Sequence, residues 1–476
     1  MDRLLEEVEV IEGRGDPART EVTSIEFDSR HVSPGALFCC LRGRAGDGHD
    51  HAPEAVGRGA TALLVERCLA LDVTQVMVAP GGARRAMAQM ACAFFGQPAR
   101  SLLTVGVTGT NGKTTVTHLL ASIFEAHQWS TTVIGTLDGA RTTPESPVLQ
   151  RLLAEARDNA RRAVAMEVSS HALAQARVDG IRFDVAVFTN LSHDHLDYHG
   201  TVDAYFAAKA SLFTPERAAL AVVNADDPRG RWLLDSSRIP TVGFTMAEVS
   251  GIESTPDHTA FTWRGRRVEL ALAGSFHVAN ALAAATTAAA LGVPEDAVQA
   301  GLHRAAPVPG RFEVVETGAP FTVVVDYAHT PDGLQVLLDS AREVAAGHRV
   351  LCVFGCGGDR DHEKRPLMGA VAAAGADVAV VTSDNSRHED PDAIIAEVLT
   401  GVPPGSRVMV RRDRAEAIEL VTDLASPGDV VVVAGKGHES EIEIGTERLP
   451  FDDRQVAAAA ASRHAGTAGA SSGDQT

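Results

Sequence analysis

Residues 102–126 read LLTVGVTGTNGKTTVTHLLASIFEA, and this stretch decides the fold class of the chain. Its apolar start is typical of a buried β-strand, which passes directly into a glycine-containing loop. Apolar residues then recur at the spacing of one helix face, at Val116, Leu119, Leu120, Ile123 and Phe124. A strand, a glycine loop and a helix in this order place backbone N–H groups and a helix dipole where they can hold phosphate.

The loop carries the side chains that a nucleotide site needs. It consists of Gly109, Thr110, Asn111, Gly112, Lys113, Thr114 and Thr115. Lys113 is predicted to neutralise the β- and γ-phosphates of ATP, and the Thr114 hydroxyl is predicted to bind Mg²⁺. The generic P-loop pattern requires a glycine where this chain has Val107, and Gly106 lies one residue too early. A glycine turn without nucleotide is the alternative, but the order of elements favours ATP.

Strand-like runs that end in polar residues continue along the chain and indicate an α/β protein of several domains. Among them are AVAMEV at 163–168 and FDVAVFTN at 183–190. A chain of 476 residues is also too long for one ordinary core. We predict a small N-terminal α/β domain (1–98), a central P-loop ATPase-like domain with a mainly parallel sheet (99–308), a C-terminal Rossmann-like α/β domain (309–459) and a disordered tail (460–476).

Composition and charge exclude several classes of function. The formal net charge of −19 argues against non-specific binding to nucleic acid or to an anionic membrane. No apolar run approaches the ~20 residues that a membrane-spanning helix needs. The start, MDRLLEEVEVIEGRGD, is acidic where a signal peptide is basic, so we expect a cytoplasmic protein.

Carboxylate and imidazole side chains follow two of the predicted strands. Glu167 ends the strand at 163–168, and His193, His195 and His199 lie in NLSHDHLDYHG after the next strand. A carboxylate and an imidazole at adjacent strand ends can complete a Mg²⁺ site that Thr114 begins. The histidine-rich segment leaves a zinc site open, and a purely structural cluster is a further alternative. Nearby carboxylates, hydroxyls and a phosphate loop favour Mg²⁺.

Lys209 occupies an unusual position in the helix-like segment DAYFAAKASLF. It lies four residues after Tyr205 and four before Phe213, on the apolar stripe of the helix. A lysine that extends to solvent from the edge of that face is one interpretation. The other is a partly buried lysine with a lowered pKa, whose free amine can react with CO₂ to form an anionic carbamate.

Seven sequence blocks occur together: GTNGKTT, MEVSSHAL, NLSHDHLDYHG, AAK, DYAHTPD, GCGGDRDHEKRPLMG and GKGHE. In this order they resemble the Mur ligase family, from about residue 22 to 455. Within that family, the chain is most similar to the ligase that adds the third amino acid to UDP-N-acetylmuramoyl-L-alanyl-D-glutamate. The resemblance implies an ATP-dependent amide ligase of peptidoglycan precursor synthesis, with roles in cell shape and division.

The resemblance also implies roles for individual residues. The positions that match those holding the UDP end of the precursor are Phe27, Ser29, Arg44, Ala45 and Gly46. The positions that match those holding its muramoyl-dipeptide part are Thr142, Thr143, Ser169, Gln175 and Arg177. The implied metal ligands are Glu167, His195 and Lys209 as a carbamate, and the further ATP contacts are Asn280, Arg311 and Asp326.

The implied pocket for the incoming amino acid decides the substrate. It comprises Arg360, Asp384, Asn385, Ser386, Arg387, Gly435 and Glu439, which match a pocket for meso-diaminopimelate. Arg387 and Arg360 can grip the carboxylate at the far end of that molecule, and Glu439 can balance its far ammonium. The family pattern Asp-Asn-Pro-Arg has Ser386 in place of proline here, so the loop loses a fixed φ.

The implied reaction phosphorylates the D-glutamate γ-carboxylate with ATP, and the amino group of the incoming amino acid then attacks the acyl phosphate. Two Mg²⁺ ions and Lys113 are expected to offset the charge that builds up. L-Lysine or another diamino acid is an alternative substrate. A P-loop kinase, a nucleotide switch or a non-catalytic nucleotide-binding module are alternatives of a different class. We expect a monomer with small-molecule partners.

Overall fold

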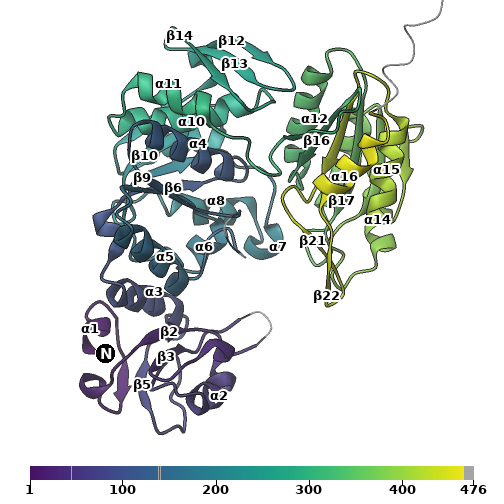
Figure 1. The fold of residues 1–476 in the computed structure, drawn as a ribbon. Helices are drawn as coiled ribbons and strands as arrows, with labels where there is room; N and C mark the ends of the chain where they lie inside the picture. Colours follow the sequence, from purple (N-terminus) through teal and green to yellow (C-terminus); the bar gives the residue numbers. More distant parts are fainter. Residues whose placement is uncertain (44–45, 138, 140, 466–476) are drawn as a thin grey trace, which may run out of the picture.

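The computed structural model describes residues 1–43, 46–137, 139 and 141–465. Its N-terminal part is a small α/β domain, at the bottom of Figure 1, whose sheet has the order β1-β5-β4-β3-β2. Only the edge strand β1 pairs antiparallel among the strands described there. The elements are α1 (Asp2–Leu5), β1 (Glu12–Arg14), η1 (Pro17–Arg19), β2 (Ser24–Glu26), η2 (Ser29–His31), β3 (Ala36–Cys39), η3 (Gly48–His51), α2 (Ala52–Gly57), β4 (Ala62–Val65), β5 (Thr74–Met77), α3 (Ala83–Phe94) and η4 (Pro98–Ser101).

The central part is built on a parallel sheet of order β11-β10-β9-β6-β8-β7. Its elements begin with β6 (Leu103–Thr108), α4 (Lys113–Ala126), β7 (Thr131–Ile134), α5 (Ser146–Asp158), β8 (Ala163–Glu167), α6 (Ser170–Ala174), β9 (Phe183–Phe188), α7 (Leu196–His199), α8 (Val202–Ala210), β10 (Ala218–Asn224), α9 (Pro228–Ser236) and β11 (Thr241–Phe244). They continue with η5 (Met246–Glu248), an antiparallel sheet of β12 (Val249–Ser254), β13 (Thr259–Trp263) and β14 (Arg266–Leu270), then α10 (His277–Ala290) and α11 (Glu295–Arg304).

The C-terminal part, at the right of Figure 1, has a sheet of order β15-β16-β20-β17-β18-β19. Only β15 runs antiparallel among these strands. The elements are β15 (Glu313–Val315), β16 (Thr322–Asp326), α12 (Pro331–Ala345), β17 (Val350–Cys356), α13 (Lys364–Gly375), β18 (Val378–Ser383), α14 (Pro391–Leu399), β19 (Val408–Val410), α15 (Arg414–Leu424), β20 (Val430–Ala434), β21 (Glu441–Ile444), β22 (Glu447–Pro450) and α16 (Asp453–Ser462).

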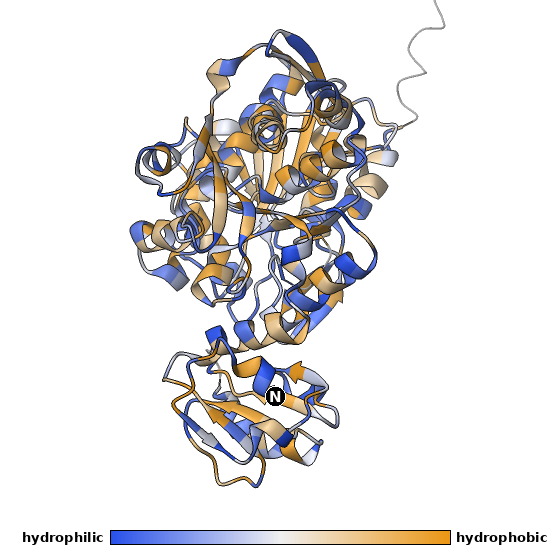
Figure 2. Cartoon of the chain, turned by 90° about the vertical axis from the view of Figure 1, so that its left-hand side faces the viewer, coloured by the Kyte–Doolittle hydropathy of each residue, from blue (hydrophilic) through white to orange (hydrophobic). Residues whose placement is uncertain are grey.

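The helix predicted after the glycine loop is α4, and its apolar face supports the central sheet. Val116, Leu119, Leu120, Ile123 and Phe124 are all buried in one core cluster with Val105 and Val107 of β6. Figure 2 shows the strands in orange between helices whose outer faces carry blue, hydrophilic residues. Such two-sided burial is typical of parallel sheets covered by helices. The predicted α/β class and three-domain architecture are therefore confirmed.

The predicted disordered tail begins too early. Helix α16 continues to Ser462, and Ala460 and Ala461 are buried against the C-terminal sheet. Ala457, Ala460 and Ala461 lie on one face of α16 and are buried together. An alanine-rich composition alone does not show that such a segment packs as a helix. Residues 466–476 lie outside the described part of the chain. Within the part described, no helix is both long and apolar enough to cross a membrane.

The sheet topology brings the chemistry of the central domain to one edge. In the sheet, β6 lies between β8 and β9. The glycine loop follows β6, Glu167 ends β8, and the histidine-rich segment follows β9. The carboxyl ends of parallel strands meet at one edge, so these three segments converge there. Helix α7 of the histidine-rich segment lies on the side that faces the C-terminal domain (Figure 1).

Candidate active site

At two positions of the glycine loop, Gly109 and Gly112, the backbone has a conformation that only glycine adopts without strain. Gly109 has a φ of 153° and Gly112 a φ of 88°. A Cβ at Gly109 would collide with Thr189 Oγ1, and a Cβ at Gly112 would collide with Asn280 Oδ1. The loop is thus packed between β9 and α10, which places the predicted ATP contact Asn280 directly beside it.

The side chain of Lys113 folds back over the glycine loop and bonds to its backbone. Its Nζ donates hydrogen bonds to the carbonyl oxygens of Gly109 at 3.0 Å and Thr110 at 2.8 Å. Burial is the main cause that lowers the pKa of Lys113, and Glu167 opposes this effect. The ammonium therefore lies where phosphate oxygens can replace the carbonyl partners. Thr114 and Thr115 are buried in the first turn of α4.

Asn111 and Thr110 tie the loop to the segment after β9. The Asn111 N–H donates to Asn190 Oδ1 at 2.9 Å, and Thr110 Oγ1 lies 3.1 Å from the Tyr205 hydroxyl. The Ser192 N–H donates to Thr110 Oγ1 at 3.0 Å. These bonds hold the loop against the histidine-rich segment, so the two can act on one ligand.

Glu167 and His195, two of the four predicted metal ligands of the central domain, both interact electrostatically with Lys113. Glu167 is buried, and its carboxylate accepts the Thr136 N–H at 2.8 Å. Partial burial is the main cause that lowers the pKa of His195 to about 3. A neutral imidazole and a carboxylate are both metal-binding forms, so these residues fit a divalent cation.

The three histidines of the HxHxxxH segment do not converge on one point. His199 Nε2 lies 3.0 Å from Ser170 Oγ, and His193 Nε2 lies 2.8 Å from Asp361 Oδ2. The His195 ring instead stands edge-on to His171, with centroids 4.7 Å apart. A zinc site made by these three side chains is therefore not formed.

Lys209 is buried, 1% exposed, rather than extended to solvent. Its Nζ donates to the Gly109 carbonyl at 2.7 Å and lies 4.6 Å from the centroid of the Tyr205 ring. Burial, followed by the charge of Lys113, holds the pKa of Lys209 well below its ordinary value. A neutral amine beside the phosphate loop is the form that reacts with CO₂. The interpretation as a solvent-exposed lysine is therefore wrong.

The predicted dipeptide-binding residues cluster around the loop before α5. Thr143 Oγ1 donates to the Glu167 carbonyl at 2.9 Å and accepts the Ser169 N–H at 3.0 Å. Arg177 Nη1 donates to the Thr143 carbonyl at 2.9 Å, and its Nη2 donates to Gln175 Oε1 at 2.8 Å. Thr142 Oγ1 lies beside them, 3.1 Å from Thr136 Oγ1. The five residues thus form one polar cluster next to Glu167, the predicted metal ligand.

The predicted UDP contacts lie in the N-terminal domain. Phe27 packs against the core of that domain, and Ser29 donates to Glu54 Oε2 at 2.8 Å. Gly46 has open space where a side chain would stand. Arg44 and Ala45 lie outside the described residues.

Two predicted ATP contacts come from the start of the C-terminal domain. Arg311 Nη2 donates to Thr114 Oγ1 at 3.2 Å, and the guanidinium lies 4.5 Å over the Tyr327 ring. Asp326 accepts the backbone N–H groups of Phe312 and Ala328, each at 2.6 Å. The C-terminal domain therefore contacts the phosphate loop through Arg311. Asp326 instead holds the backbone at Phe312 and Ala328 in place.

A cavity of about 210 Å³ lies between the central and C-terminal domains. All residues predicted for the amino-acid pocket line it except Ser386, together with His195 on the opposite side. Ser386 is buried, and its carbonyl packs against Gly358. Gly435 has a φ of 117°, and a Cβ there would stand 2.8 Å from Asp384 Oδ2. A side chain at this position would therefore collide with the Asp384 carboxylate, and glycine avoids the collision.

Three family models match the chain, one in each of its three parts. The Mur ligase family catalytic domain matches residues 21–100, the Mur ligase middle domain matches 107–288, and the Mur ligase glutamate ligase domain matches 310–437. The UDP-N-acetylmuramoyl-L-alanyl-D-glutamate–2,6-diaminopimelate ligase of Geobacillus kaustophilus is 47% identical over 92% of this chain and 95% of that protein. The protein of the same name from Synechococcus elongatus is 44% identical over 92% of this chain and 93% of that protein.

The chain belongs to the Mur ligase family.

Solved structures of Mur ligases share the fold. A structure of a UDP-N-acetylmuramoyl-L-alanyl-D-glutamate–2,6-diaminopimelate ligase has a TM-score of 0.64 and 32% identity, covering 95% of this chain and 97% of its own. The MurF ligase of Thermotoga maritima in complex with ADP has a TM-score of 0.64 and 20% identity, covering 94% and 97%. The second likeness bears on the fold alone.

Two residues that sequence reasoning did not assign, Lys436 and Glu443, lie behind the wall of the amino-acid cavity and bond to side chains that line it. Lys436 is fully buried, and its Nζ donates to Asn385 Oδ1 at 3.1 Å and to Glu439 Oε2 at 2.9 Å. Glu443 accepts from Arg387 Nε at 3.0 Å, while Arg387 Nη1 donates to the Gly358 carbonyl at 2.8 Å. Lys436 belongs to the GKGHE segment, which follows the buried strand β20. A lysine so close to the end of a buried strand was the feature of the sequence that could have indicated this residue.

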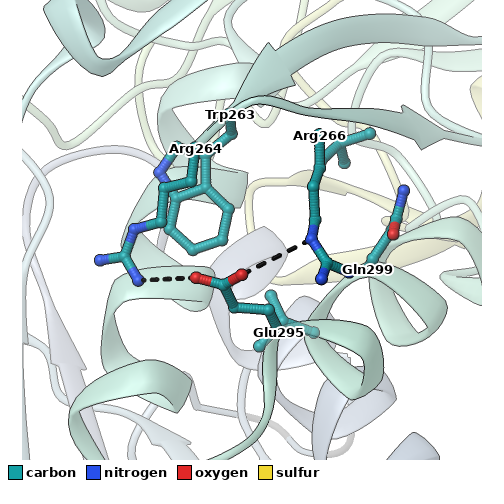
Figure 3. Close-up of a pocket in the computed structure, with 7 residues that line it drawn as sticks. Trp263, Arg264, Arg266, Glu295 and Gln299 are labelled. Carbon is teal, nitrogen blue, oxygen red and sulfur yellow. Dashed lines mark ion pairs between the residues drawn. The ribbon is translucent and has the colours of Figure 1, made fainter.

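A second, much smaller cavity lies between the β13–β14 hairpin and α11 (Figure 3). Glu295 pairs there with Arg264 and Arg266 at 3.6 Å each, and Arg264 lies 4.4 Å over the Trp263 ring. Its volume of about 10 Å³ holds at most one water molecule. None of the predicted site residues lines it. It is therefore a small gap in the packing between the hairpin and α11 rather than a binding site.

Proposed function

We propose that this Mur ligase joins meso-diaminopimelate to the D-glutamate γ-carboxylate of UDP-N-acetylmuramoyl-L-alanyl-D-glutamate, with hydrolysis of ATP to ADP and phosphate. The observation that carries the proposal is the cavity that Arg360 and Arg387 line opposite His195. It offers an amino acid two guanidinium groups for a distal carboxylate. The relatives that share 47% and 44% of their sequence bear the name of this reaction.

In this proposal, each of the three domains binds a different part of the substrates. The N-terminal domain (1–98) holds UDP, the central domain (99–308) holds ATP and the dipeptide, and the C-terminal domain (309–459) delivers the amino acid. Thr143, Ser169 and Arg177 orient the dipeptide so that its γ-carboxylate faces the ATP γ-phosphate. We further propose that the protein acts in the cytoplasm, as a monomer, on small-molecule substrates.

The residues of the glycine loop supply most of the charge compensation. Lys113 exchanges its carbonyl partners for phosphate oxygens, and Arg311 adds a second cation from the other domain. Thr114, Glu167, His195 and the carbamate of Lys209 would hold Mg²⁺, and the ion would supply positive charge against the phosphate oxygens. Because ATP and the amino acid are bound by different domains, the domains must close for reaction.

The amine attacks only after the acyl phosphate has formed. Asp384 lines the amino-acid cavity, where burial raises its pKa but Arg414 and Lys436 outweigh this and hold it low. Its ionised carboxylate can therefore hold the α-ammonium of the incoming amino acid near the reacting carbon. After the ammonium loses a proton to solvent, its nitrogen attacks the acyl carbon and phosphate leaves. Lys436 neutralises Glu439 in part and fixes Asn385, which leaves the cavity wall ordered before substrate arrives.

Release of ADP tests this proposal against a kinase or a nucleotide switch. Purified protein with ATP and the UDP-dipeptide is expected to release ADP continuously only when diaminopimelate is added. Lys113→Ala is expected to remove nearly all of this turnover, since Lys113 acts on phosphate charge, while the variant keeps the wild-type circular dichroism spectrum. Steady ADP release without any amine, or an active Lys113→Ala variant, would contradict the proposed reaction.

A further inference from the structure

A histidine and two carboxylates from different domains meet at the rim of the amino-acid cavity. His193 follows β9 in the central domain, whereas Asp361 and Glu363 precede α13 in the C-terminal domain. One ligand atom of each lies within 4.8 Å of the other two. No other group of three histidine, cysteine, aspartate or glutamate side chains lies this close together in the part of the chain that the structure describes.

The spacing of these atoms fits a tetrahedral transition-metal site. Zn²⁺ binds imidazole nitrogen and carboxylate oxygen at about 2.0–2.1 Å, so two ligand atoms on one tetrahedral edge stand about 3.3 Å apart. His193 Nε2 and Asp361 Oδ2 are 2.8 Å apart, so a small opening admits the ion. Glu363 is exposed, so its side chain can adjust without disturbing the core.

The ligand at the centre of the group is held in place before any ion binds. Asp361 Oδ1 accepts the Glu363 backbone N–H at 2.9 Å, which leaves Oδ2 facing His193. The Asp361 side chain is 8% exposed and that of His193 is 27% exposed. A fixed and partly buried carboxylate distinguishes this group from acidic side chains that only share a surface.

We propose that His193, Asp361 and Glu363 form a binding site for one divalent transition-metal ion, such as Zn²⁺ or Co²⁺, which clamps the central domain to the C-terminal domain. Water completes the coordination, and a small tetrahedral set that includes an imidazole suits these ions, whereas Mg²⁺ prefers six ligands that are mostly oxygen. The site is distinct from the proposed Mg²⁺ ligands Glu167 and His195. Because its ligands come from both domains, the ion binds only while the domains are closed, and it stabilises that arrangement.

Titration of the full-length protein with Co²⁺ in buffer that contains excess Mg²⁺ tests the proposal. Visible absorption reports low-coordinate Co²⁺, and calorimetry with Zn²⁺ gives the number of ions. One ion per chain is expected. Glu363→Gln and His193→Ala are each expected to weaken binding by about tenfold or more, because loss of a ligand costs at least as much as loss of a supporting contact. Zn²⁺ should raise the melting temperature of the wild type more than that of Glu363→Gln.

Two control variants separate this site from its neighbours. His388→Ala removes another histidine–aspartate contact of 2.8 Å, to Asp359, from the same end of the domain but without a third ligand. His195→Ala removes a proposed Mg²⁺ ligand. Both are expected to keep Co²⁺ binding at the wild-type affinity.

Three results would overturn the proposal: no Co²⁺ or Zn²⁺ binding tighter than about 1 mM, binding that Glu363→Gln and His193→Ala leave unchanged, or binding that His195→Ala abolishes. Glu363 is exposed, so Glu363→Gln remains folded and informative even if His193→Ala is not. The spectroscopic readout requires no ligase turnover, so a negative result leaves the proposed amide-forming reaction untouched.

Discussion

At the scale of single residues, the site depends on charges that are withdrawn from water. Lys113 and Lys209 both donate to the Gly109 carbonyl, at 3.0 and 2.7 Å, so two lysines approach one oxygen. Two ammonium groups this close repel each other, and Lys113 contributes to the lowered pKa of Lys209. Conversion of Lys209 to a carbamate would replace that repulsion by attraction. The sequence placed Lys209 on an apolar stripe, but the partner that explains it lies 100 residues earlier in the chain.

Replacement of Lys209 tests the carbamate directly. Lys209→Ala is expected to lose nearly all ligase turnover, because the anionic metal ligand disappears. Formate or acetate at high concentration is expected to restore part of the rate by occupying the vacated anionic position. Turnover is measured as ADP release with all three substrates present, and Lys209→Arg serves as a control that keeps a cation but cannot form the carbamate. Wild-type turnover in either variant would rule the carbamate out.

At the scale of elements, one buried carboxylate joins the N-terminal domain to the dipeptide-binding surface. Glu145 precedes α5 and is 5% exposed. It accepts from Arg84 of α3 at 3.1 Å and from Arg141 at 2.7 Å, and it pairs with Arg177 at 3.1 Å. Arg177 is a predicted substrate contact, so Glu145 fixes its position and ties it to α3. No local pattern in the sequence indicates this meeting of three arginines.

Glu145→Gln is expected to lower stability by ~2–3 kcal/mol, because three guanidinium groups lose their shared counter-ion in a partly buried place. It should also raise the KM for the UDP-dipeptide more than it lowers kcat, since Arg177 loses its support. Thermal unfolding and steady-state kinetics measure the two effects. The control is Glu155→Gln, which breaks an exposed pair with Arg151 on α5 and is expected to change neither. Equal behaviour of the two variants would show that Glu145 does not position Arg177.

At the scale of the whole molecule, the sequence predicted elements whose signals lie within one short segment. It did not predict the side-chain contacts that join the central and C-terminal domains. The strand, loop and helix at 102–126 were predictable because their signals lie within one stretch of chain. The contacts of His193 with Asp361 and of Arg311 with Thr114 join residues 168 and 197 positions apart. Such pairs form only after the domains have folded and closed, and no short pattern encodes them. The individual site assignments stay predictions, and so do the domain boundaries apart from the start of the tail, which helix α16 moves beyond Ser462.

The central claim is that the closed molecule selects diaminopimelate through Arg360 and Arg387. Lysine lacks the distal carboxylate, so neither guanidinium would gain an anionic partner from the ligand, and Arg387 would keep only its ion pair with Glu443. Charge-assisted hydrogen bonds of this kind contribute ~1.5–3 kcal/mol each, which predicts discrimination of roughly 10²-fold or more.

The most direct measurement is the mass of the product formed when wild-type protein receives ATP, the UDP-dipeptide, and equal amounts of meso-diaminopimelate and L-lysine. The predicted result is a UDP-tripeptide that contains diaminopimelate, with the lysine product at about one hundredth of its amount or less. Comparable amounts of both products would contradict the arginine-based account of the cavity, and the absence of any UDP-tripeptide would contradict the ligase itself.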